Sequence, residues 1–355
     1  MLYVRDLTEF SPKELAEYLE IEDSLSLGIL RAAGAIAPSR EPANAYNALK
    51  EVTQENGVVT FVKGIDDMLG SGVAIGSITE FAGTPGVGKT QLAMQLCIDV
   101  QIPHIFHGLG GRAVYIDTEG SFCDAVDRVA QMAESVVTHL KRTARHRDGS
   151  TDDVRAKAAA EVTVEGLLGG IDCYRAHNRA ELLTAVAQLD GRLAVDPSIK
   201  LVVIDSVAFP FRAVGSASKD AIKTRDRELQ DLARDLHRLA LERRVAVVVT
   251  NHLGLRFDKG TQTFLLSPTL GEVWHHGVST RVLCFQQPRG GGLGTGHGLP
   301  HSRFKRVAQL VKSTRHKAGS ASFRITREGV RGDDPSSSST ATAAHNGNGK
   351  RPLPA

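Results

Sequence analysis

GTPGVGKT, residues 83–90, is the stretch of sequence that decides the fold. It matches the phosphate-binding pattern G-x-x-x-x-G-K-[ST] without a gap. The apolar run ITEFA precedes it, and the helical run QLAMQLCIDV follows it. Glycines let the backbone curl so that its N–H groups surround phosphates, and the start of the following helix adds partial positive charge. This context predicts a strand, a phosphate-binding loop and a helix, in that order.

The side chains of this loop have separate expected roles. Lys89 would reach the β- and γ-phosphates, and the Thr90 hydroxyl would ligate Mg²⁺, so the expected ligand is ATP with Mg²⁺. A glycine-rich turn without a ligand is the alternative. The residues expected to line the nucleotide are Gly83, Thr84, Pro85, Gly86, Val87, Gly88, Lys89, Thr90 and Gln91.

Two further apolar runs end in acids. LVVID, residues 201–205, ends in Asp205, which we expect to hold Mg²⁺ largely through water. VYIDTE, residues 114–119, ends in Glu119, the candidate base that orients water in line with the γ-phosphate. For both acids the alternative is a carboxylate that only borders a loop.

A third run, VVTNH at residues 248–252, ends in an amide and an imidazole. Asn251 is predicted to sense the γ-phosphate and to pass its presence to the following loop. The alternative is a turn-forming Asn251 beside an exposed His252. Because the carboxyl ends of neighbouring parallel strands open into one crevice, we expect Glu119, Asp205 and Asn251 to lie together near the phosphate loop.

Short apolar runs alternate with helical patterns through the middle of the chain. Runs such as VAVVV, residues 245–249, lack polar alternation, which is typical of strands covered on both faces. This order predicts an α/β fold with a mostly parallel central sheet. A long amphipathic helix is expected over Arg225–Glu242, and strands are expected at Ser77–Ala82, Ala113–Asp117, Asp172–Arg175, Leu201–Asp205, Val245–Thr250 and Thr280–Phe285.

The flanking segments differ in composition. Residues 1–37 predict a short helical piece, because Ser11-Pro12-Lys13-Glu14 is a capping-box pattern and a second helix is expected from Ser26 to Ala35. Two such helices cannot make an independent core, so this piece is an appendage or a truncated domain. Residues 38–58 indicate a linker, 59–332 the core, and 333–355 a disordered tail, while the Gly-rich stretch 288–303 predicts a long loop.

Composition excludes several classes of protein. The 355 residues are 41% hydrophobic and 23% charged, which excludes disorder as the main state. The net charge of +3 favours anionic partners only weakly. Four widely spaced cysteines without a C-x-x-C pair indicate a reduced, intracellular protein with neither a zinc site nor a disulfide framework. A run of about 18 apolar residues is absent, so no membrane span or membrane partner is expected.

GTPGVGKTQL, YIDTEGSF, LVVIDS and VVTN occur in an order that resembles the eukaryotic RecA-type strand-exchange recombinases and their paralogues. The resemblance covers roughly residues 59–332 and implies a RecA-like P-loop ATPase core. It extends to residues 3–37, which resemble the second half of that family's N-terminal helical domain. The segments Gln91–Pro103, Ala208–Arg212 and Leu270–Trp274 are similar to the C-type branch of paralogues.

The resemblance implies functional roles for the matched residues. Lys89 and Glu119 would be catalytic, Thr90 and Asp205 would hold Mg²⁺, and the loops after Asp205 and Asn251 would face DNA. Phosphates would attract the cations there, and Phe209, Phe211 or Phe257 could stack on unpaired bases, unless these side chains are simply core and solvated surface. The candidate DNA-binding cations are Arg212, Lys219, Lys223, Arg225, Arg256 and Lys259.

The implied function is a nuclear DNA-dependent ATPase of homologous recombination, double-strand-break repair and meiosis. It would bind single-stranded and branched DNA and form hetero-oligomers with other paralogues and the main recombinase. Two departures keep alternatives open. His252 replaces the family's glutamine, which allows a nucleotide-stabilised scaffold with little turnover. Ala45-Tyr46-Asn47-Ala48 lacks the family's Phe anchor, which argues against the other alternative, a self-assembling strand-exchange recombinase.

Overall fold

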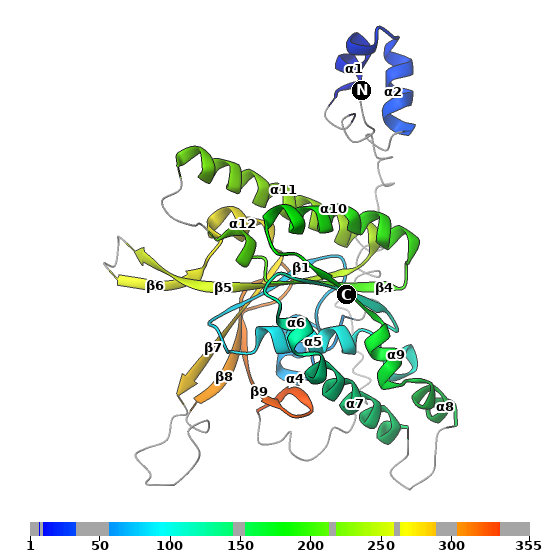
Figure 1. Cartoon of the computed structure of the whole chain (residues 1–355), viewed down its shortest axis with the longest axis vertical. Helices are drawn as coiled ribbons and strands as arrows, with labels where there is room; N and C mark the ends of the chain where they lie inside the picture. The colour runs from blue at the N-terminus through cyan, green and yellow to red at the C-terminus, as the bar shows by residue number, and fades with distance from the viewer. Residues whose placement is uncertain are drawn as a thin grey trace, which may run out of the picture. The chain divides into compact units, whose positions relative to one another are not determined.

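Six parallel strands form the centre of the computed structural model, and each carries one of the predicted apolar runs (Figure 1). They are β1 (Ile78–Gly83), β2 (Arg112–Asp117), β3 (Ile171–Arg175), β4 (Ile199–Asp205), β5 (Ala246–Asp258) and β7 (Thr280–Pro288). The structure describes residues 7, 10–32, 57–144, 153–212, 218–258, 263–288 and 304–333. The predicted α/β fold with a mostly parallel sheet is confirmed.

The strand order along the sheet is β10-β9-β8-β7-β1-β5-β4-β2-β3, and β6 pairs with β5. β1 lies between β5 and β7, with Gly83 beside both His252 and Cys284. β4 runs parallel to β2, with Asp117 in register with Asp205. The carboxyl ends of β1, β2, β4 and β5 therefore lie next to one another. This arrangement is required if Glu119, Asp205 and Asn251 are to lie near the phosphate loop.

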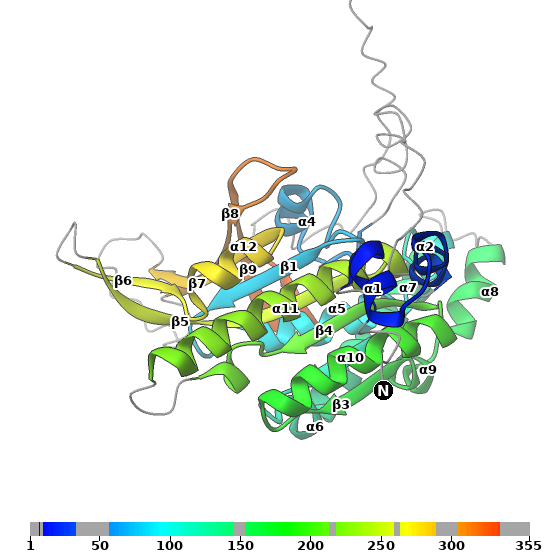
Figure 2. The ribbon, with the colours of Figure 1, turned by 90° about the horizontal axis from the view of Figure 1, so that it is seen from above.

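Helices cover both faces of the sheet, with α10, α11 and α12 on one face and α5, α7 and α9 on the other (Figure 1). Figure 2 shows α10 and α11 side by side across the sheet, and Arg243 of α11 pairs with Asp190 of α10 at 2.7 Å. The helices are α4 (Lys63–Leu69), α5 (Lys89–Asp99), α6 (Ser121–Asp124), α7 (Val126–Thr143), α8 (Asp153–Glu161), α9 (Val164–Gly169), α10 (Arg179–Val195), α11 (Lys219–Arg243) and α12 (Gly271–Gly277), with 3₁₀ turns η2 (His104–Phe106) and η3 (Phe209–Phe211).

Two apolar layers hold these helices on the sheet. One layer is built on Leu92, Leu96 and Ile98 of helix α5. The other is built on the buried leucines of α11, which are Leu229, Leu232, Leu236 and Leu239. Burial of a Leu or Ile side chain stabilises the fold by about 1.5–3 kcal/mol each. No described helix is long and apolar enough to cross a membrane.

The structure extends the sheet beyond the predicted strands. β8 (Phe304–Lys312), β9 (Gly319–Thr326) and β10 (Gly329–Gly332) add antiparallel strands next to β7. β5 continues to Asp258 and pairs with β6 (Thr263–Pro268), so the segment predicted as a loop after Asn251 is a β-hairpin in its described part. The helix predicted to begin at Arg225 begins at Lys219, where Ser218 caps it.

The chain divides into two compact units, Met1–Glu55 and Asn56–Ala355. In the smaller one, α1 (Pro12–Leu19) begins with the predicted capping box: Ser11 accepts from Glu14 N at 3.3 Å and donates its own N–H to Glu14 Oε2 at 2.8 Å. α2 (Asp23–Ala32) begins three residues before the predicted Ser26, whose hydroxyl donates to the Pro12 carbonyl oxygen.

Several predicted segments lie partly or wholly outside the described residues. These are the linker residues 38–56, the Ala45–Ala48 segment, the Gly-rich stretch 289–303 and the tail residues 334–355. Val58, predicted as the end of the linker, pairs with Val73 and is buried in the core of the larger unit. The core therefore starts before Val59.

Candidate nucleotide-binding site

The phosphate loop lies between the end of β1 and the start of α5, as the pattern predicted. Gly88 has φ +112°, and a Cβ there would lie 2.8 Å from Ile325 Cδ1. A Cβ on Gly83 would lie 2.4 Å from the carbonyl oxygen of Cys284 in the adjacent strand. Glycine is therefore needed at both positions, once for backbone conformation and once for close strand packing.

Lys89 occupies the first turn of α5 and is 7% exposed. Its Nζ donates to the carbonyl oxygens of Gly83 at 3.0 Å and Thr84 at 3.1 Å. Burial lowers the pKa of Lys89, and the nearby Asp205 and Glu119 carboxylates oppose that shift. The ammonium group is thus held inside the curl of the loop, where phosphate oxygens can replace the carbonyls as its partners.

Asp205 ends β4 and is 3% exposed. Its carboxylate accepts hydrogen bonds from Tyr115 Oη at 2.7 Å and from the Thr250 hydroxyl. Burial raises the pKa of Asp205, while hydrogen bonds from Thr250, Tyr115 and Thr90 oppose the shift. Thr90 and Asp205, the two residues predicted to hold Mg²⁺, are therefore in contact. A hydroxyl and a carboxylate are the oxygen ligands that Mg²⁺ prefers, so the donor set fits the ion.

Glu119 follows β2 in a loop that Asp117 organises. The Asp117 carboxylate accepts from the backbone N–H groups of Glu119 at 3.1 Å, Gly120 at 2.7 Å and Phe122 at 3.0 Å. Thr118 exchanges two hydrogen bonds of 2.8 Å with the backbone of Ser206. These bonds tie the loop after β2 to the end of β4, and so bring Glu119 beside Asp205.

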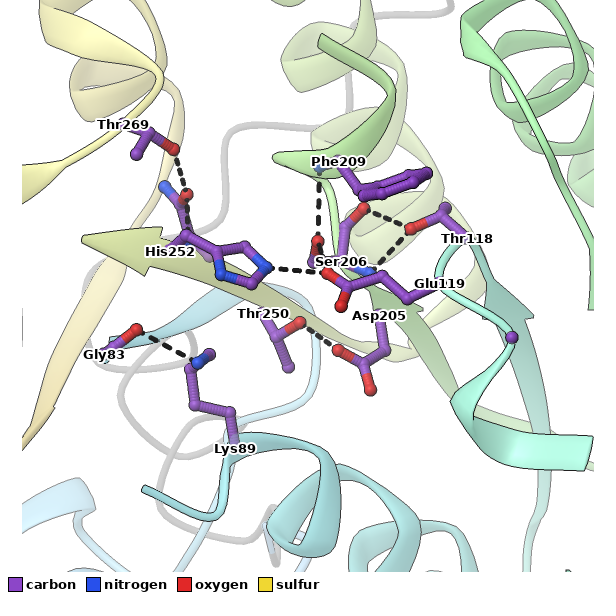
Figure 3. A network of polar contacts seen from close by, with 12 residues as sticks. Gly83, Lys89, Thr118, Glu119, Asp205, Ser206, Phe209, Thr250, His252 and Thr269 are labelled. Carbon is purple, nitrogen blue, oxygen red and sulfur yellow. Dashed lines mark hydrogen bonds and ion pairs between the residues drawn. The ribbon is translucent and has the colours of Figure 1, made fainter. Parts of the chain in front are cut away.

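The Glu119 carboxylate faces the phosphate loop and is bound by two neighbours (Figure 3). Oε1 accepts from Ser206 Oγ at 2.5 Å and lies 2.6 Å from His252 Nε2. The hydrogen bond from His252 is the main cause that lowers the pKa of Glu119 from 4.5 to about 2, with Ser206 and Arg212 acting in the same direction. Glu119 is therefore ionised at neutral pH, as a water-orienting base must be.

Asn251 lies in the interior of the protein, although it was predicted to sense phosphate. It is fully buried, and its Nδ2 donates to Glu80 Oε1 at 2.6 Å while its Oδ1 accepts from Thr269 Oγ1 at 3.0 Å. Both ends of the amide are thus engaged. The next residue, His252, is the one whose ring reaches Glu119.

Glu80 is a residue of this region that sequence reasoning missed. It is a fully buried acid on β1 that accepts from Asn251, from Trp274 Nε1 at 2.9 Å and from Arg281 Nε. An acid inside the apolar run ITEFA was the available signal, since a buried carboxylate requires partners. It connects β1 and β5 to α12 and β7.

Gln91, predicted near the nucleotide, accepts from Arg128 Nε at 2.7 Å. The other guanidinium nitrogens of Arg128 donate to the carbonyl oxygens of Thr326 at 2.5 Å and Arg327 at 2.6 Å. Arg128 therefore links α5 and α7 to the end of β9 beside the phosphate loop.

The predicted DNA-binding residues are only partly brought together. Arg212 is exposed and lies over the Phe209 ring at 5.3 Å, and Phe209 is 39% exposed. Phe211 is 2% exposed and packs in the core, so the prediction that it could stack on bases is wrong for this structure.

Lys219 and Lys223 are exposed on the first turns of α11. Arg225 is half-buried and pairs with Asp226 at 3.1 Å. Arg256 lies in β5, where only its backbone is described, and Lys259 lies outside the described residues. Among the predicted DNA-binding cations, those that the structure describes as exposed are Arg212, Lys219 and Lys223.

A phosphate loop between β1 and α5, with acids at the ends of β2 and β4, defines a P-loop protein with a RecA-like core. A model of the Rad51 family matches residues 54–143 and 153–333. The chain therefore belongs to the Rad51 family.

Two relatives with the name DNA repair protein RAD51 homolog 3 are similar to this chain. The protein from Cricetulus griseus is 36% identical over 337 residues, which cover 94% of this chain and 84% of the relative. The protein from Dictyostelium discoideum is 33% identical over 292 residues, which cover 81% of this chain and 70% of the relative. These similarities agree with the resemblance to recombinase paralogues.

Proposed function

We propose that this protein is a DNA-dependent ATPase of recombinational DNA repair, and a paralogue of the C-type branch. The observation that carries the proposal is the convergence of Lys89, Thr90, Asp205 and Glu119 on one phosphate loop. Lys89 and Thr90 begin α5, Asp205 ends β4 and Glu119 follows β2. These three parts of the chain supply the cation, the metal ligands and the base that ATP hydrolysis requires.

The side chains have distinct tasks in this proposal. Lys89 exchanges its two carbonyl partners for phosphate oxygens, and the backbone N–H groups of the loop surround the same phosphates. Thr90 and Asp205 hold Mg²⁺, which neutralises charge on the phosphates when bound. Glu119, ionised at neutral pH, accepts a hydrogen bond from the attacking water and orients it toward the γ-phosphate.

DNA contact is assigned to Arg212, Lys219 and Lys223, which lie on the segment that follows β4. Support comes from their exposure and from the position of Arg212 close enough to Glu119 to lower its pKa. Exposed cations of this kind bind phosphate backbones with a strong dependence on salt. Single-stranded and branched DNA are the proposed ligands.

The proposed partners are other Rad51-family proteins, in hetero-oligomers, and the proposed compartment is the nucleus. Support comes from the names of the relatives, which are DNA repair proteins, and from family membership.

The test is ATP hydrolysis by the purified chain, with and without single-stranded DNA, beside Lys89→Ala. Lys157→Ala, on the exposed face of α8, is the matched control. Turnover that DNA stimulates, and that only Lys89→Ala abolishes, supports the proposal. Tight ATP binding without turnover in any DNA or partner mixture contradicts the ATPase assignment and favours a nucleotide-stabilised scaffold.

A further inference from the structure

The imidazole of His252 in β5 lies against the carboxylate of Glu119 in the loop after β2 (Figure 3). The His252 side chain is 14% exposed and that of Glu119 is 31% exposed, so both groups are partly shielded from water. An ionised carboxylate only accepts hydrogen bonds, and therefore Nε2 of His252 carries a proton and donates it to Oε1.

Both donors to Glu119 meet the same oxygen. Ser206 Oγ and His252 Nε2 reach Oε1, and the described part of the chain provides no donor to Oε2. A carboxylate fixed at one oxygen from two directions has little rotational freedom, and it presents its second oxygen in one direction. Oε2 is therefore the atom left to accept a hydrogen bond from a substrate water.

The backbone around His252 is equally fixed. Its N–H donates to Asn251 Oδ1 at 2.7 Å, and its carbonyl oxygen accepts from Thr269 N at 3.1 Å. Asn251 is in turn held by Glu80 and Thr269. The ring thus projects from the root of the β5–β6 hairpin on a rigid strand, which is what accurate positioning of a second side chain requires.

We propose that His252 is a positioning residue for ATP hydrolysis, which holds Glu119 by Oε1 so that Oε2 receives the attacking water. The inference rests on the proposed ATPase function. It gives a role in hydrolysis to His252, the residue that stands where the family has a glutamine. Ser206 is the second support of the same oxygen.

Single-turnover hydrolysis of bound ATP tests this role, because it separates the chemical step from nucleotide binding. His252→Ala should lower the rate about 10- to 100-fold, since a misplaced reacting group costs up to about 10²-fold. The affinity for a fluorescent ATP analogue should change less than about twofold. His252→Gln, whose amide N–H can donate to the same oxygen, should recover most of the rate.

The double variant shows whether His252 acts through Glu119. His252→Ala should cost little when Glu119 is already Gln, because residues that act as a unit are not additive. His177→Ala, at an exposed histidine two residues before α10 begins, is the matched control and should leave the rate unchanged. A full rate in His252→Ala, equal loss in the Ala and Gln variants, or additive losses with Glu119→Gln would each overturn the proposal.

A measurement without turnover separates this inference from the proposed function. In protein labelled with ¹⁵N-histidine, the His252 ring nitrogens should respond to Glu119→Gln and not to Glu134→Gln, an exposed acid on α7. A response together with hydrolysis supports the inference. An unresponsive ring overturns it even in an active ATPase, and a chain that binds ATP but never hydrolyses it overturns the proposed function together with the role of His252 in hydrolysis.

Discussion

Tyr115 and Asp205, on the adjacent strands β2 and β4, share a buried hydrogen bond of 2.7 Å. The tyrosine ring is fully buried and the acid is 3% exposed. The phenol is one of three hydroxyl groups that lower the pKa of Asp205 against the effect of burial. Tyr115 therefore helps to keep the proposed Mg²⁺ ligand ionised.

Tyr115→Phe should weaken Mg²⁺-dependent nucleotide binding. Without the phenol, the pKa of Asp205 rises further, so a smaller fraction of the protein carries the anionic ligand at a given pH. The variant should also lose about 1–2 kcal/mol of unfolding free energy, because a buried acceptor loses a donor. Nucleotide titrations at several Mg²⁺ concentrations measure the first effect, and urea unfolding measures the second. Tyr174→Phe, on the exposed edge strand β3, is the control and should change neither.

Glu80→Gln should destabilise the protein by about 3–5 kcal/mol. The substitution keeps the shape of the side chain but leaves the Arg281 guanidinium, whose side chain is 6% exposed, without its counter-charge. Trp274 and Asn251 also lose a charged acceptor. Urea unfolding beside Glu134→Gln, at an exposed position on α7, measures the difference. If Glu80→Gln loses no more unfolding free energy than the control, the pairing of Glu80 with Arg281 does not stabilise the fold.

The parallel core and the phosphate site could be predicted from sequence because both depend on local patterns. Apolar runs between helices identify buried strands, and GTPGVGKT specifies its own loop geometry. Asp205 and Glu119 were predicted because each directly follows such a run. The structure brings them together through bonds between Thr118 and Ser206.

The features that could not be predicted, strands β8, β9 and β10 and the burial of Asn251, depend on contacts between distant parts of the chain. β8, β9 and β10 follow a Gly-rich stretch, and their antiparallel partners are other strands of the same late segment and β7. Asn251 was expected at the phosphates because it ends a strand. In the structure Asn251 is buried, and its Nδ2 donates to Glu80, 171 positions away in the chain. A single sequence holds no signal for that contact beyond an acid in an apolar run.

Gly88→Ala should reduce nucleotide affinity about 5- to 150-fold. Gly88 has φ +112°, and an added Cβ would lie 2.8 Å from Ile325 Cδ1. Strain of about 1–3 kcal/mol would be relieved by a shift of the loop that receives the phosphates, and each 1.4 kcal/mol corresponds to about a factor of ten in affinity. Titration with a fluorescent ATP analogue measures the change. Gly169→Ala, in α9 where an added Cβ meets nothing within 4 Å, should leave affinity unaltered. Equal nucleotide affinities of the two variants would contradict the geometry assigned to the loop.

The contact between Glu119 and His252 should be visible in the pH dependence of stability. Folding lowers the pKa of Glu119 from 4.5 to about 2, so the ionised acid stabilises the folded state fully above pH 4.5. That contribution declines as the pH falls from about 4.5 toward 2, because the unfolded chain binds the proton first. The difference in unfolding free energy between wild type and Glu119→Gln should therefore shrink over this interval. Urea unfolding at pH 7, 5, 4 and 3 measures it, with Glu134→Gln to account for an ordinary exposed acid. A difference that stays constant from pH 7 to 3 would mean that Glu119 has an unperturbed pKa and that the hydrogen bond from His252 does not hold it in solution.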